Sequence, residues 1–203
     1  MPASGDCELI TTGFWGQPVN AISSLALVVI GIGLLRRRPV LGWLAVAAGI
    51  GSFLYHGPMP SWSEWAHDTT LAGLLIGLML ETRAVALLRS LTLVGVGFAV
   101  FPAGAEPVTL LIAVAAAIAL VVTRRPRWPR WRRTTISAGT VLLVAGSIGV
   151  LSRSGGPLCS PESLVQGHAF WHVGAAIALW LYGSAVPGFH QPSVTSTAKD
   201  PSE

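Results

Sequence analysis

Two histidines, His168 and His172, stand four residues apart near the start of the last apolar segment of the chain. On an α-helix, residues at positions i and i+4 lie one above the other on the same face, so both imidazoles can reach one metal ion. Such pairs also occur as ordinary packing or interfacial residues, and the spacing alone leaves both interpretations open. A position inside a membrane segment favours the ligand interpretation, because an ionisable group there costs free energy and is usually kept for a function.

The composition is that of a membrane protein. Of the 203 residues, 52% are hydrophobic and only 11% are charged, and the mean hydropathy is +0.63. The sequence predicts an all-α membrane protein in which residues 1–187 form one seven-helix transmembrane domain and residues 188–203 form a disordered cytoplasmic tail. The expected segments approach the roughly 20 residues that a tilted span needs, and they are 19–35, 40–56, 65–80, 88–101, 107–122, 134–151 and 164–186.

The basic residues predict the orientation in the membrane. With seven spans, every lysine and arginine except Arg153 falls on one side. The positive-inside rule then places the C-terminus in the cytoplasm and the N-terminus outside, in a multi-pass protein of the cell membrane. The arginine-rich loop containing Trp128 and Trp131 is interpreted as an interfacial anchor rather than a nucleic-acid site. Neither a nucleic-acid partner nor an obligate protein partner is evident.

Other chemically capable side chains fall on the outer side, near the histidine pair. Ser52 and His56 are again four residues apart, at the outer end of the second segment, and Asp68 opens the third. Three neutral imidazoles with a fourth position open to water are the arrangement of a catalytic zinc. A carboxylate that does not bind the metal can act as base and acid. We therefore predict a zinc site formed by His56, His168 and His172, with Asp68 as the acid/base group.

Two assignments in this site have alternatives. His67 could replace His56 as the third ligand, although adjacent residues of a helix point to different faces, so His67 and Asp68 are not expected to face the site together. Ser52 either donates a hydrogen bond to a developing oxyanion or to the zinc-bound water, or bonds to a carbonyl of its own helix. The first histidine of the pair is followed by alanine, not by the glutamate of the zincin motif, so the base must come from another helix.

The N-terminal part of the chain adds a second group of residues. Cys7 precedes the first segment and Cys159 precedes the seventh, both on the oxidising outer side, where they could form a disulfide. Asn20 and Ser24 are another i, i+4 pair, best interpreted as hydrogen-bonding residues between helices. An oxygen-rich cap ahead of that pair falls short of the six to eight oxygen ligands that calcium prefers; its members would be Asp6, Glu8, Trp15 and Gln17.

These residues, in this order and on this side, resemble the alkaline ceramidase family, within the superfamily that includes the adiponectin-type (PAQR) receptors and GPI-lipid remodelling proteins. The resemblance covers nearly all seven segments. It is carried by Cys7-Glu8, Asn20, Ser24, Ser52-x-x-x-His56, Asp68 and Gln166-x-His168-x-x-x-His172. It implies a membrane-embedded zinc amidase that releases a fatty acid from a ceramide or another N-acyl lipid. It further implies that His56, His168 and His172 bind the zinc. Ser52 would be the hydrogen-bonding serine and Asp68 the acid/base aspartate, and Cys7 would be paired with Cys159 in a disulfide.

The chain departs from the eukaryotic members at the start of the first helix. Those members carry a fuller acidic calcium cluster, with a carboxylate entering the helix, where this chain has Gln17, Pro18 and Val19, so calcium stays undecided. The compact loops and the Ala-, Gly- and Arg-rich composition are typical of bacterial proteins. Two other classes are retained: a lipid-sensing receptor with a closed structural zinc site, and a transporter or proton relay, whose polar groups would run across the whole membrane.

Overall fold

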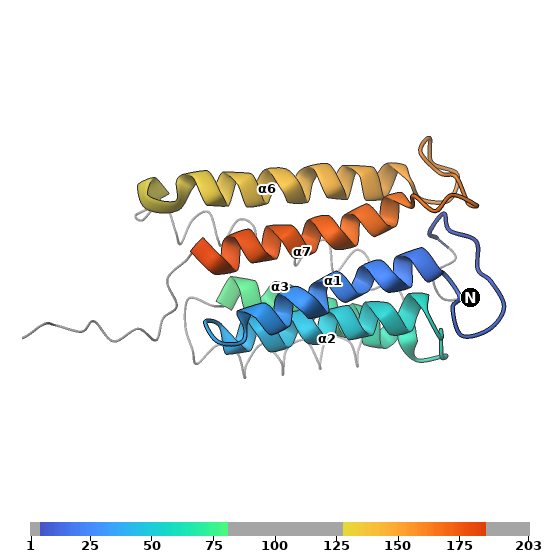
Figure 1. Cartoon of the computed structure of the whole chain (residues 1–203), viewed down its shortest axis with the longest axis horizontal. Helices are drawn as coiled ribbons and strands as arrows, with labels where there is room; N and C mark the ends of the chain where they lie inside the picture. Colours follow the sequence, from blue (N-terminus) through green and yellow to red (C-terminus); the bar gives the residue numbers. More distant parts are fainter. Residues whose placement is uncertain (1–4, 81–127, 186–203) are drawn as a thin grey trace, which may run out of the picture.

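The computed structural model describes residues 5–80 and 128–185 (Figure 1). Within these residues the protein is all-helical, without strands, which confirms the all-α prediction for this part of the chain. The helices are α1 (Pro18–Leu34), α2 (Pro39–His56), α3 (Ser63–Leu80), α6 (Trp128–Leu151) and α7 (Gly167–Ala185). They correspond to five of the expected segments. The expected segments 88–101 and 107–122 and the tail at 188–203 lie outside the described residues.

Helix α6 begins at Trp128, earlier than the expected residue 134. The arginine- and tryptophan-rich stretch, expected as a loop, is therefore helical from Trp128 onward. Pro129 does not prevent this, because proline is well tolerated in the first turn of a helix, where its missing N–H has no intrahelical acceptor. The expected start at residue 134 is where the hydrophobic residues begin. The arginines before it do not stop the helix, because arginine is itself a good helix former.

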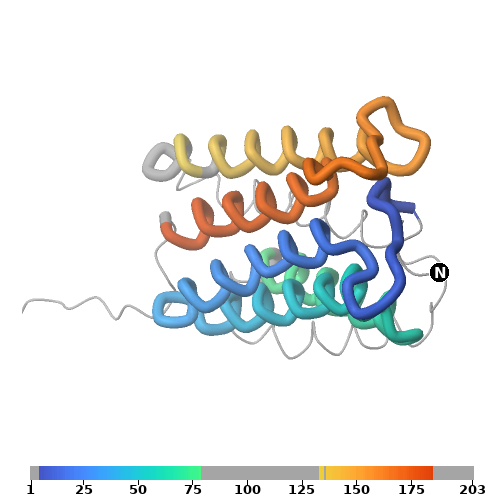
Figure 2. The backbone as a smooth tube through the Cα atoms, turned by 45° about the vertical axis from the view of Figure 1, so that its right-hand side comes forward, coloured from blue at the N-terminus to red at the C-terminus, as the bar shows by residue number. Residues whose placement is uncertain are grey.

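Each helix contacts the next in the order α6, α7, α1, α2, α3, and Figure 1 shows α3 behind α1 and α2. Because neighbours along the chain run in opposite directions, α2 ends at the same end of the bundle at which α1, α3 and α7 begin. The N-terminal segment and the connection between α6 and α7 meet at that end too (Figure 2). We call it the histidine end, because it carries His56, His168 and His172.

A carboxylate from outside the helix caps α1. The helix opens with Pro18, and Gln17 gives no side-chain cap. Instead, the two carboxylate oxygens of Glu8 accept the backbone N–H groups of Val19, at 2.7 Å, and Asn20, at 2.8 Å. These amides have no acceptor within the helix, and negative charge is favourable at a helix N-terminus. Glu8 therefore ties the N-terminal segment to the start of α1.

Glycine allows α1 and α2 to pack closely away from the histidine end. A Cβ built on Gly31 would lie 2.7 Å from the carbonyl oxygen of Gly42, and one on Gly42 would lie 2.8 Å from that of Gly31. Gly49 faces Ser24 and Val28 of α1 in the same way. Small residues at such crossings are typical of helices that associate inside membranes, where close packing drives association.

One of the described helices, α2, has both the length and the hydropathy of a membrane span. Helix α1 and residues 136–151 of α6 are apolar but shorter than that limit. The core between the helices consists mostly of aliphatic side chains, among them Leu27, Leu34, Leu41, Leu74 and Leu179. The polar residues predicted to form the site lie beyond this core, at the histidine end.

Candidate metal centre

Three histidines from two helices converge at the histidine end. His56 is the last residue of α2, and His168 and His172 occupy the first two turns of α7. Their ring centroids are 4.6–5.2 Å apart, and one ligand atom from each lies within 4.8 Å of the others. His56 and His172 are buried, whereas the side chain of His168 is 21% exposed. The three residues predicted as ligands are therefore close enough to hold a metal ion.

The ring of His56 is oriented by an amide. Its Nδ1 lies 2.7 Å from Oε1 of Gln17, an acceptor, so Nδ1 carries the proton. The amide of Gln17 is fixed in turn, because its Nε2 donates to the backbone oxygen of Glu8 at 2.8 Å. Nε2 of His56 is left as the nitrogen with a free lone pair, which is the form that binds a metal.

The ring of His172 is oriented by a hydroxyl of α1. Its Nδ1 lies 2.9 Å from Oγ of Ser23, whose own proton is donated to the backbone oxygen of Asn20 at 2.9 Å. Ser23 therefore accepts the Nδ1 proton of His172, and Nε2 again keeps its lone pair. Ser23 could not be singled out from the sequence, because a hydroxyl that faces another helix has no distinctive spacing of its own.

Ser52 lies directly beside this nitrogen. Its Oγ is 3.1 Å from Nε2 of His172 and 2.9 Å from Oγ of Ser24. Ser24 donates its own proton to the backbone oxygen of Asn20, so it can accept the proton of Ser52 and leave Nε2 of His172 available. The contact between Ser24 and Ser52 also links α1 to α2, as expected for a polar residue between helices. Ser52 thus bonds across helices at the site.

The third histidine lies next to a carboxylate. Oδ1 of Asp6 is 3.2 Å from Nδ1 of His168, and Oδ2 is 3.8 Å from Nδ1 of His56. Nε2 of His56 and Nε2 of His168 are buried without a hydrogen-bond partner in the part of the chain that the structure describes. Buried lone pairs in native proteins normally find a partner. A metal ion bound by these nitrogens would satisfy both, so the residues present fit a three-histidine metal site.

Asp68 and His67 form a pair beside this cluster, at the start of α3. Nδ1 of His67 lies 2.9 Å from Oδ1 of Asp68, and its ring stacks on Tyr55 with the centroids 4.8 Å apart. The ring of His67 is 6.3 Å from that of His56. The cluster therefore contains His56 and not His67. The two neighbours contact each other, contrary to the simple expectation that adjacent residues face apart, because the carboxylate turns back onto the ring.

The N-terminal segment is fastened to the site at two points. A disulfide joins Cys7 to Cys159 in the α6–α7 connection, as the sequence analysis proposed. Glu8, the residue after Cys7, caps α1 with its carboxylate. Burial raises the pKa of Glu8 above its ordinary value of 4.5, and the N–H groups of Val19 and Asn20 oppose that rise. Glu8 belongs to the oxygen-rich cap that was considered for calcium. Both of its carboxylate oxygens accept hydrogen bonds from backbone N–H groups of α1.

The arrangement combines three convergent imidazoles, the hydroxyl of Ser52 at their edge and the carboxylate of Asp6 beside two of the rings, with the His67–Asp68 pair next to His56. No protein-family model matches the chain, and neither a curated protein nor a solved structure matches it significantly. The function is therefore inferred from the chemistry of these side chains and from the surface of the bundle that surrounds them.

Proposed function

We propose that the protein is a zinc-dependent intramembrane hydrolase that cleaves the amide bond of a ceramide or another N-acyl lipid and releases a fatty acid. The observation that carries this proposal is the convergence of His56, His168 and His172, each with a protein acceptor beside its Nδ1. Such outer partners are typical of metal-binding histidines. Structural zinc sites are usually closed by four protein ligands, whereas three histidines leave a position open for reaction.

The roles of the surrounding residues follow from their chemistry. Zinc in an open three-histidine site polarises a carbonyl and lowers the pKa of water to about 7. When substrate binds, the hydroxyl of Ser52, beside Nε2 of His172, turns from Ser24 and donates its hydrogen bond to the carbonyl oxygen as that oxygen gains negative charge. The carboxylate of Asp68 takes the proton of the attacking water and returns it to the leaving amine. The contact between Asp68 and His67 orients that carboxylate.

A membrane location is supported by exposed apolar stripes on two helices. On α1 and on α7, large apolar side chains recur every three or four residues and are at least 38% exposed. A water-soluble monomer rarely exposes continuous apolar stripes of this kind. In a bilayer the same side chains contact lipid, so we assign all of the described helices to the membrane. The stripes comprise Ile22, Leu25, Val29 and Ile32 on α1, and Phe170, Val173, Ile177 and Trp180 on α7.

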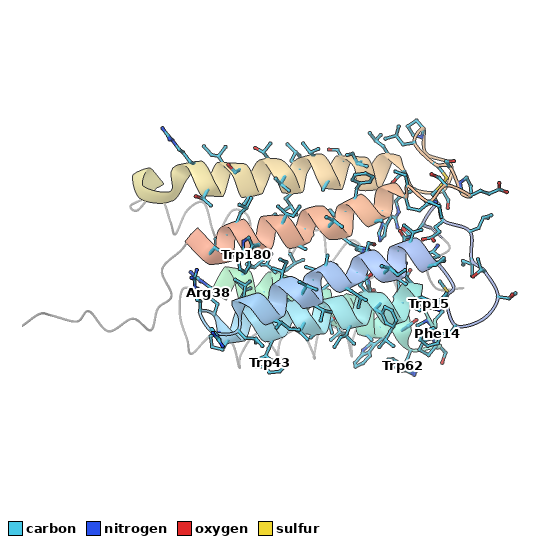
Figure 3. The ribbon with its side chains drawn as sticks, viewed as in Figure 1. Phe14, Trp15, Arg38, Trp43, Trp62 and Trp180 are labelled. Atoms are coloured by element: carbon cyan, nitrogen blue, oxygen red, sulfur yellow. A yellow bond between two sulfur atoms is a disulfide. The ribbon has the colours of Figure 1, made fainter. Side chains whose placement is uncertain are left out.

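Exposed aromatic residues near both ends of the bundle support the same placement. Phe14, Trp15 and Trp62 lie at the histidine end, and Trp43 and Trp180 lie toward the opposite end (Figure 3). Tryptophan is enriched at both interfaces of a membrane, where its ring is partly in lipid and partly in water. The site then lies close to one interface, which the distribution of arginines assigns to the outer face. At that depth the amide group of a lipid can reach the histidines while its acyl chain stays in the bilayer.

The experiment that tests the proposal is the zinc content of the detergent-purified protein, followed by hydrolysis assays on a panel of N-acyl lipids that includes ceramides. We expect about one zinc per chain in the wild type and none in the double variant His168→Ala/His172→Ala. The matched control is His67→Ala, which removes a neighbouring imidazole outside the cluster and should keep its zinc.

The outcomes separate the functional classes. Zinc in the wild type together with release of a fatty acid supports the hydrolase. Zinc without turnover of any N-acyl lipid would favour the receptor class instead. A wild-type protein without metal would overturn the zinc site and return the histidines to packing or proton transfer.

A further inference from the structure

Asp6 lies in an unusual position for a residue of an irregular segment. Its side chain is only 5% exposed, and its carboxylate contacts two of the three clustered histidines, at 3.2 Å from Nδ1 of His168 and 3.8 Å from Nδ1 of His56. Burying a carboxylate is costly unless it is paired. Both contacts are with Nδ1, whereas Nε2 of each ring is the nitrogen that has no hydrogen-bond partner among the described residues.

The position of Asp6 is held by contacts with a distant part of the chain. The backbone of Asp6 forms an isolated antiparallel bridge with Arg153, and its carbonyl oxygen accepts the hydroxyl proton of Ser154 at 2.9 Å. The next residue, Cys7, is joined to Cys159 by the disulfide. Figure 2 shows this N-terminal segment lying against the connection between α6 and α7. Asp6 is therefore fixed on the same connection that leads into His168.

The three histidines receive different partners. The partner of His56 is the amide oxygen of Gln17 and that of His172 is the hydroxyl of Ser23, both neutral. His168 is more exposed than the other two, and its partner is a charged carboxylate. A negative charge beside Nδ1 favours the tautomer that carries the proton on Nδ1, which frees the Nε2 lone pair and makes it a stronger ligand.

We propose that Asp6 is a positioning residue of the metal centre, which holds His168 in the tautomer and orientation needed to bind zinc through Nε2. This inference rests on the proposed zinc site. In this arrangement Asp6 acts from the side of the ring that faces away from the metal. Its role is distinct from that of Asp68, which transfers a proton in the proposed reaction.

The test compares zinc affinity in Asp6 variants, measured by competition with a chromophoric chelator in detergent. Loss of such an outer partner typically weakens metal binding about 10–100-fold. We expect a loss of this size in Asp6→Asn and Asp6→Ala and partial recovery in Asp6→Glu, which restores a carboxylate. The matched control is Glu64→Gln, which removes one negative charge from an exposed position at the start of α3 and should leave the affinity unchanged.

A spectroscopic measurement separates positioning from a general loss of structure. With Co²⁺ in place of zinc, the visible absorption bands report the ligand field, and we expect them to change in Asp6→Asn and to return toward the wild type in Asp6→Glu. Wild-type affinity and an unchanged Co²⁺ spectrum in Asp6→Asn and Asp6→Ala would overturn the inference and leave the zinc site intact. Absence of zinc from the wild-type protein would overturn both.

Discussion

The two ends of the bundle are held together in different ways. At the histidine end, α1, α2 and α7 are connected by hydrogen bonds between polar side chains, and a disulfide fastens the N-terminal segment to the α6–α7 connection. Away from that end, α1 and α2 approach through Gly31 and Gly42, and leucines such as Leu34 and Leu41 fill the remaining space.

This difference supports the proposal that the histidine end is the site of chemistry. Close packing is sufficient to hold helices together, so a bundle does not need buried histidines, serines and carboxylates for stability. Such groups are costly to bury and are retained where they act. Substitutions of the clustered histidines and of the residues that contact them are therefore expected to change metal binding and catalysis. Substitutions in the glycine contact are expected to change stability alone.

The largest expected effect is that of Asp68→Asn on turnover. Asparagine keeps the shape of the side chain but cannot accept and return a proton, and a general acid/base contributes about 10²–10⁴-fold to a rate. We expect hydrolysis to fall by that factor while about one zinc per chain and the melting temperature are kept. Initial rates and metal analysis on the same preparation check this. Retained activity in the variant would contradict the role of Asp68.

The next largest effect is expected from removing the disulfide in Cys7→Ser/Cys159→Ser. Native disulfides typically contribute about 2–5 kcal/mol, so the melting temperature should fall. Because Cys7 adjoins Asp6, zinc affinity should also fall, in the direction expected for Asp6→Asn. A triple variant with Asp6→Asn should lose little further affinity, since two changes that act through one contact are not additive. Undiminished zinc affinity in the double variant would show that the disulfide does not position Asp6.

A smaller effect is expected in the glycine contact. Gly42→Leu would place a side chain against the backbone of α1, and overpacking of this kind costs about 1–3 kcal/mol. The folded fraction should still bind about one zinc per chain. Gly139→Leu on α6 is the matched control, because a Cβ built there meets nothing within 4 Å. Thermal melting and metal analysis compare the two variants. Equal melting temperatures would mean that the close approach of α1 and α2 does not contribute to stability.

The histidine cluster could be predicted from the sequence because its members lie on regular helices. The i, i+4 spacing places His168 and His172 on one face, and alternating helix directions bring His56 to the same end. Asp6 could not be assigned in this way. It lies in an irregular segment, and its place depends on the disulfide and on contacts with Ser154, none of which leaves a periodic pattern.

The cap on α1 was missed for a related reason. Glu8 is 11 and 12 residues away from the amides that it accepts, whereas recognised capping patterns lie within a few residues of the helix start. The start of α6 was predicted too late, because the helix begins at Trp128, ahead of its first hydrophobic stretch. Local sequence patterns therefore predicted the regular helices, and the contacts made by irregular segments, apart from the disulfide, required the structure.

The smallest expected effect concerns the stability contributed by Glu8. Because burial raises its pKa above 4.5 in the folded protein, the folded state binds the proton more tightly than the unfolded state does. Stability from this group is then present at low pH and is lost as the pH rises through the raised pKa. Glu8→Gln keeps an acceptor for α1 and cannot ionise. We expect the melting temperature of this variant to rise relative to that of the wild type as the pH increases from about 4.5 to 7, the range above the ordinary pKa of glutamate.

A second variant separates the charge of Glu8 from its role as a cap. Glu8→Ala removes the acceptors altogether and should cost about 1 kcal/mol relative to Glu8→Gln at every pH. A difference between wild type and Glu8→Gln that does not change with pH would contradict the raised pKa. The expected pH dependence would mean that the N-terminal segment keeps an ionisable group at a cost in stability. That cost would be confined to the histidine end, since the glycine contact between α1 and α2 contains no group that titrates in this range.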